Sequence, residues 1–255
     1  MRDTWNPWHG CRKYSEGCAH CYVYRRDAMY GLDSTEVRQT ADFNLPVRRH
    51  RDGSWKIPSG AHIYACMTSD FFLEDADRWR DDAWGFINRR SDVTFSIITK
   101  RILRAADCLP MNWGEGYPNV RLGLTCENQS RADERMDAFL ALPVQDRFIV
   151  CEPMLGKIDL SPWLARGGIT CVIAGGESGP DARPLYYEWV LALRDQCAAN
   201  QVRFHFKQTG ANFVKDGRRY RIERRLQSAQ AKRAGIDWQR TEGDTSMTRA
   251  LSDHD

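Results

Sequence analysis

The clearest pattern along the chain is a series of short apolar runs, each followed by polar residues and then by a longer stretch. The runs are rich in β-branched and aromatic residues, as in buried strands, and the longer stretches have helical spacing. Strands are expected at residues 4–6, 62–67, 94–99, 120–125, 147–150, 169–174 and 202–206. Helices are expected up to about residue 90, after residue 101, and at 130–142 and 187–199. This alternation predicts βαβ units and an α/β fold with a mostly parallel sheet.

Polar residues follow nearly every expected strand. They are Ser69, Asp70, Lys100, Thr125, Glu127, Glu152, Gly175, Gly176, Glu177, Lys207 and Gln208. In parallel α/β barrels the carboxyl ends of the strands form the ligand-binding face, so we expect these residues to surround one site. The alternative is a structural rim, in which the acids cap helices or pair with the two lysines.

Composition and charge exclude some classes of protein. The chain has 255 residues, enough for one barrel-like domain with a substantial core. Charged residues make up 28%, and the mean hydropathy is −0.60. No apolar run approaches the roughly 20 residues that a membrane helix needs. The first residues, Met1-Arg-Asp-Thr, have no signal-peptide pattern, so a cytoplasmic protein without a membrane partner is expected.

The most informative motif is a cysteine loop near the N-terminus. Cys11, Cys18 and Cys21 have the spacing C-x6-C-x2-C, and a glycine precedes each of the first two. Structural zinc normally takes four ligands, so three thiolates alone make an incomplete zinc site. They suit a [4Fe-4S] cluster that keeps one iron open, because thiolates are the usual cluster ligands.

Two other interpretations of the cysteines are open. A zinc site would be complete if His9 or His20 supplied the fourth ligand. Four further cysteines lie in or beside the apolar runs and are expected to be small core residues, because free cysteine is commonly buried. These are Cys66, Cys126, Cys151 and Cys171.

The cysteine loop and the strand series resemble the radical S-adenosylmethionine (SAM) superfamily, whose usual motif is C-x3-C-x2-C. Here the first interval is three residues longer, and His20 stands where an aromatic residue often precedes the third cysteine. Over most of residues 3–215 the chain is similar to a family of phage- and prophage-associated three-cysteine proteins of unassigned function. The resemblance implies a partial (β/α)6 barrel with the cysteine loop after a very short first strand.

The resemblance also implies an activity. The protein would be an iron–sulfur enzyme that cleaves SAM to a 5′-deoxyadenosyl radical, using an electron from a flavodoxin or ferredoxin. Asp70 would meet the SAM amino group beside Ser69, and Lys100, Thr125 and Glu127 would meet its carboxylate or ribose. The turn with Gly175, Gly176 and Glu177 would contact adenine, ribose or substrate. Glu152, Lys207 and Gln208 would face the substrate.

Basic residues gather in two runs, at 48–51 and 215–225, although the net charge is only +3. The second run interleaves arginine with tyrosine, which suits stacking on bases and neutralising phosphates, although such runs are commonly solvated surface. A nucleic acid is therefore one expected substrate or partner. The alternative function is a non-catalytic zinc or Fe–S protein of a phage-encoded nucleic-acid complex. We expect the barrel over residues 1–215 and a polar extension over 216–255, disordered in part from residue 243 onward.

Overall fold

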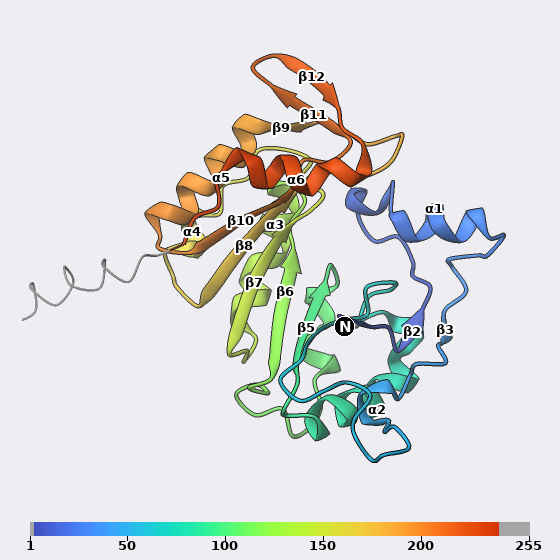
Figure 1. The fold of residues 1–255 in the computed structure, drawn as a ribbon. Helices are drawn as coiled ribbons and strands as arrows, with labels where there is room; N and C mark the ends of the chain where they lie inside the picture. Colours follow the sequence, from blue (N-terminus) through green and yellow to red (C-terminus); the bar gives the residue numbers. More distant parts are fainter. Residues whose placement is uncertain (1–2, 240–255) are drawn as a thin grey trace, which may run out of the picture.

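The computed structural model describes residues 3–239, so the segment expected to be disordered lies outside the described residues. Seven strands form one all-parallel sheet in the order β1-β4-β5-β6-β7-β8-β10, which curls into a half-barrel (Figure 1). The strands are β1 Thr4–Trp5, β4 His62–Ala65, β5 Thr94–Thr99, β6 Val120–Thr125, β7 Asp146–Cys151, β8 Ile169–Gly175 and β10 Arg203–Gln208. The predicted fold class, a parallel partial barrel of α/β type, is confirmed.

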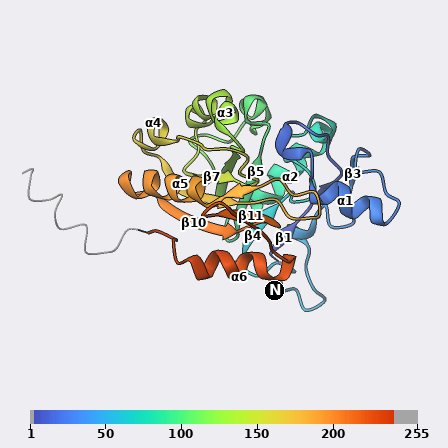
Figure 2. The ribbon, with the colours of Figure 1, turned by 90° about the horizontal axis from the view of Figure 1, so that it is seen from above.

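Helices alternate with most of these strands. The α-helices are α1 Tyr22–Met29, α2 Asp77–Arg89, α3 Gln129–Ala141, α4 Ser161–Leu164, α5 Tyr187–Ala199 and α6 Arg224–Ala234. Short 3-10 helices are η1 Glu16–Cys18, η2 Leu45–Val47, η3 Glu74–Ala76, η4 Ile102–Arg104 and η5 Ala106–Cys108. The helix expected after Arg101 is therefore two 3-10 turns. Figure 2 shows α3 and α4 along one side of the sheet and α6 along the other.

The central strands are apolar along their whole length because both faces of the sheet are covered. Phe95 and Ile97 of β5 and Leu122 of β6 are all buried, as expected of a parallel sheet covered on its faces. Gly123 of β6 faces the Phe148 ring, where a Cβ atom would come within 2.5 Å of Phe148 Cζ. The cysteines expected in the core are indeed buried.

The C-terminal part adds a small sheet and a helix. Strands β9 Leu185–Tyr186, β11 Asn212–Lys215 and β12 Arg218–Arg221 form a three-stranded sheet, in which β11 and β12 make an antiparallel hairpin. Helix α6 contacts β10 and buries Gln227 and Ala231. Within the expected polar extension, residues 216–239 form β12 and α6, and α6 packs on β10 of the half-barrel. None of the helices in residues 3–239 has the length and apolar character of a membrane-spanning segment.

Candidate functional site

The cysteine loop lies at the carboxyl ends of the parallel strands. It follows β1 and the short strand β2 (Trp8–His9), which pairs with β3 (Arg38–Gln39), and α1 begins directly after Cys21. Cys11, Cys18 and Cys21 are each half-buried and line the same cavity, whose volume is about 270 Å³. The order β1, loop, α1 therefore brings three thiols to one strand-end cavity.

Most residues expected at the ligand-binding face line this cavity. They are Ser69, Asp70, Lys100, Thr125, Glu152, Gly176, Glu177, Lys207 and Gln208. Glu127 and Gly175 do not line it. Tyr22 and Arg101 also line the cavity, although neither was expected there from the sequence. Each directly follows an expected site residue in the sequence. Arg224, from the basic run at 215–225, lines the cavity as well.

Glu127 is a buried residue that contacts the cysteine loop. Its Oε2 atom lies 2.8 Å from Nη1 of Arg135, and both side chains are fully buried. Ser15 Oγ donates a hydrogen bond to Glu127 Oε1, and a Cβ atom at Gly17 would lie only 2.8 Å from the same oxygen. The expectation that Glu127 meets the SAM carboxylate or ribose thus conflicts with its position: the carboxylate is enclosed by protein and holds the loop.

Asp70 and Arg101 connect the loop to the end of β5. Asp70 Oδ1 accepts hydrogen bonds from Thr99 Oγ1 (2.7 Å) and the Phe72 amide (3.0 Å), and Oδ2 accepts one from the Lys100 amide (3.0 Å). Arg101 Nη1 lies 3.9 Å from Asp70 Oδ2, while its Nη2 donates to the Arg12 carbonyl at 2.9 Å. The buried Arg101 side chain therefore links the cysteine loop to the strand that carries Lys100.

The two lysines of the cavity differ in their partners. Lys207 Nζ lies 2.7 Å from Glu152 Oε2, and Gln208 donates to the other oxygen of the same carboxylate. Within residues 3–239 the Lys100 side chain makes neither a hydrogen bond nor an ion pair. A cation without a hydrogen bond or ion pair in this cavity is available to a ligand anion. Glu177, in contrast, is paired with Arg183.

Burial controls the ionisation of the first cysteine. Burial, together with the nearby Asp70 carboxylate, raises the pKa of the Cys11 thiol to about 12, although Arg101 opposes the shift. Within the described residues, no three His, Cys, Asp or Glu side chains are gathered as a metal-ion group. The chemistry of the donor set nevertheless fits a thiolate-bound cluster, because three half-buried cysteines from one loop line a common cavity.

The two histidines that could complete a zinc site lie in different places. His9 Nε2 is 2.8 Å from Asp27 Oδ2 and lines a separate pocket. His20 is exposed and lines the cavity of the three cysteines. A Cys3His zinc site in this arrangement would therefore use His20.

Comparison with known proteins gives the family. A family model described as "protein of unknown function (DUF5131)" matches residues 1–246. The chain belongs to this family. The description names no activity, cofactor or substrate. None of the curated proteins and none of the solved structures matches the chain.

Proposed function

We propose that this chain is a radical SAM enzyme that binds a [4Fe-4S] cluster through Cys11, Cys18 and Cys21. The observation that carries the proposal is that these cysteines line one cavity with the polar residues that end the parallel strands. When bound, the cluster and SAM supply one-electron cleavage of the S–C5′ bond, with the electron from a flavodoxin or ferredoxin, giving methionine and a 5′-deoxyadenosyl radical that takes hydrogen from the substrate.

The residues around the cavity have complementary chemistry for SAM. The unpaired Lys100 ammonium suits the SAM carboxylate. The Asp70 carboxylate suits the SAM ammonium, because a carboxylate has about four acceptor positions and Asp70 uses three of them for protein donors. Ser69 and Thr125 add hydroxyl groups, and Gly176 places a wall without a side chain beside them for adenine or ribose. The Glu152, Lys207 and Gln208 group on the later strands remains for the substrate.

Contacts from α1 close one side of the cavity. Tyr22 donates a hydrogen bond to the Met67 carbonyl, and Arg25 Nη1 donates to the Ser178 carbonyl at 2.8 Å. These bonds connect the helix after the cysteine loop to the turns after β4 and β8. Such closure limits the access of water, which reactive intermediates require.

Anaerobic reconstitution tests the function directly. With iron and sulfide the protein should turn brown and bind SAM in a way that changes the EPR spectrum of its reduced cluster. Dithionite and SAM should then yield 5′-deoxyadenosine. A colourless protein that holds zinc and leaves SAM intact would support the alternative, a non-catalytic metal protein of a nucleic-acid complex.

Replacing Lys100 by Met should weaken SAM binding about 10- to 100-fold, because a hydrogen bond to a charged group contributes roughly 1.5–3 kcal/mol. Equilibrium binding of SAM to the reconstituted protein measures the effect, and the iron content should not change. The matched control is Lys157→Met, since Lys157 is exposed and lies outside the cavity. Equal SAM affinity in the two variants would remove Lys100 from the site.

The basic hairpin makes a nucleic acid a candidate substrate. All four residues of β12 are exposed, and the hairpin lies beyond the carboxyl ends of the half-barrel strands (Figure 1). Arg224, at the start of α6, lines the cavity itself. A strand held on the hairpin by its phosphates would therefore lead to the cavity.

Changing Arg218, Arg219 and Arg221 together to Gln should make nucleic-acid binding less dependent on salt. Each phosphate contact to a single strand contributes about 0.7 to the slope of log K against log salt, so the slope should flatten by about 2. Fluorescence anisotropy with a single-stranded oligonucleotide across a salt series measures it. The control is a triple Gln variant of Arg89, Lys157 and Arg233, which loses the same charge outside the hairpin. Its slope of log K against log salt should equal that of the unmodified protein. An unchanged slope in the hairpin variant would exclude β12 as the contact surface.

A further inference from the structure

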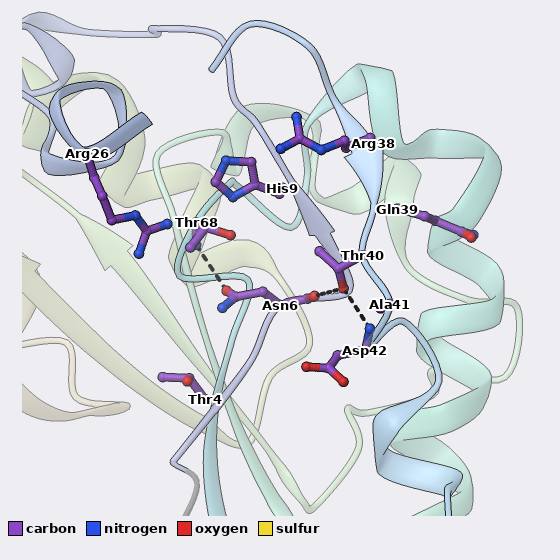
Figure 3. A pocket seen from close by; sticks show the side chains of 10 residues that line it. All are labelled: Thr4, Asn6, His9, Arg26, Arg38, Gln39, Thr40, Ala41, Asp42 and Thr68. Carbon is purple, nitrogen blue, oxygen red and sulfur yellow. Dashed lines mark hydrogen bonds between the residues drawn. The ribbon is translucent and has the colours of Figure 1, made fainter. Parts of the chain in front are cut away.

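A second pocket lies at the β1 edge of the half-barrel, outside the cavity of the cysteines. Its volume is about 430 Å³, and its walls come from β1, the β2–β3 pair, α1 and the turn after β4 (Figure 3). Polar and charged side chains dominate the lining, including Asn6, His9, Arg26, Arg38 and Thr68. Such a lining suits a polar or charged ligand.

Two arginines enter the pocket from different elements. Figure 3 shows the Arg26 side chain extending from α1 towards Thr68 and the Arg38 side chain extending from β3 towards His9. Arg26 Nε lies 3.9 Å from Asp27 Oδ1, and its guanidinium makes no hydrogen bond within residues 3–239. Arg38 has no side-chain partner in the same part of the chain. Arg26 has this one ion pair through Nε in the described part of the chain, so the N–H groups of both guanidinium groups remain available to donate to an anion.

The acidic groups near these arginines already have other partners. Asp27 Oδ2 accepts hydrogen bonds from His9 and Ser34. Asp42, in the pocket wall, lies 2.9 Å from Arg48. Asp27 therefore offsets part of the Arg26 charge at 3.9 Å, whereas neither carboxylate makes a hydrogen bond to Arg26 or Arg38 within the described residues.

A neutral donor adds to the two arginines. Asn6 Oδ1 accepts a hydrogen bond from the Thr68 amide at 3.1 Å, so the Asn6 amide nitrogen points away from that bond (Figure 3). The pocket then offers two guanidinium groups, a side-chain amide and the Thr4 hydroxyl. A guanidinium group can donate two parallel hydrogen bonds to a phosphate. A phosphate has several negatively charged oxygens, so it can accept hydrogen bonds from more than one side of the pocket.

We propose that this pocket binds a phosphate group of the substrate. Thr68 lines both this pocket and the cavity of the cysteines, so the two sites are adjacent. The pocket's role as a substrate subsite rests on the proposed function, whereas its binding of phosphate does not. The phosphate belongs to a nucleotide, either free or within a nucleic-acid strand.

Calorimetric titration of the full-length chain, before and after cluster reconstitution, tests the pocket. Inorganic phosphate and adenosine 5′-monophosphate should bind, whereas adenosine should not. Arg26→Gln and Arg38→Gln should each weaken binding about tenfold, as expected for losing a charged hydrogen-bond donor. Arg89→Gln, on the exposed face of α2, should have no effect. Absence of phosphate binding, or an equal loss in the Arg89 control, would overturn the proposal.

Competition identifies the source of the phosphate. If a short single-stranded oligonucleotide displaces adenosine 5′-monophosphate in an Arg26-dependent way, the ligand is a chain phosphate; if it does not, the ligand is a free nucleotide. Both results support the site. SAM cleavage measured without substrate keeps the two proposals apart: phosphate binding without SAM cleavage rejects the enzyme activity alone, and SAM cleavage without phosphate binding rejects the pocket alone.

Discussion

Replacing any one of Cys11, Cys18 or Cys21 by Ala will remove most of the iron from the reconstituted protein and abolish formation of 5′-deoxyadenosine. In the proposed site each thiolate is one of three protein ligands, so its loss would leave the cluster with two. Even changes to groups that support a metal ligand cost about 10- to 100-fold in metal affinity, and loss of a ligand should cost more. Iron and sulfide per chain, together with product yield, measure the effect.

Two other cysteines serve as matched controls for this result. Cys108 and Cys197 are buried in the core and do not line the cavity. Their Ala variants should keep the full iron content and product yield, after correction for any loss of folded protein. Full iron retention in all three loop variants would contradict the cluster assignment, and loss of zinc in their place would favour the metal-protein alternative.

The sheet and the position of the site were predictable because both follow from simple repeating patterns. Strands β5 and β6 were predicted with the bounds that the structure has, since parallel strands covered on both faces are apolar throughout. Parallel strands also end at one edge of a sheet, so the polar residues that follow them gather without any knowledge of side-chain contacts. The same reasoning could not tell Asp70, which lines the cavity, from Glu127, which is enclosed beneath the loop.

The remaining features depend on contacts that leave no periodic signal. Strands β2, β3 and β9 have two residues each, too few for an alternating pattern. The hydrogen bond from Ser15 to Glu127 spans 112 positions in the sequence, and that from Arg101 to Arg12 spans 89. The pocket proposed to bind phosphate likewise combines β1, α1 and β3, whose side chains come together only in the folded chain.

Replacing Glu127 by Ala is expected to destabilise the protein by about 3–5 kcal/mol, because the fully buried Arg135 guanidinium loses its buried ion-pair partner and keeps the exposed Glu134, 3.4 Å from its Nε. It also removes the acceptor for Ser15, so iron retention should fall although Glu127 is not a cluster ligand. Denaturant unfolding of the cluster-free chain gives the free energy of unfolding, and iron analysis after reconstitution gives the effect on the loop.

Glu134 on the same helix provides the control for this prediction. It lies 2.7 Å from Arg131 and 3.4 Å from Nε of Arg135 but is exposed, and exposed carboxylates contribute about 0–1 kcal/mol to such pairs. Glu134→Ala should therefore have a small effect on unfolding and none on iron content.

If Arg135 is changed to Met in addition to Glu127→Ala, much of the stability should return, because no unpaired charge stays buried. Iron retention should stay low in that double variant, since Ser15 still lacks its acceptor. A Glu127 variant that is no less stable than the Glu134 control, and that keeps its iron, would show that the buried pair does not hold the cysteine loop.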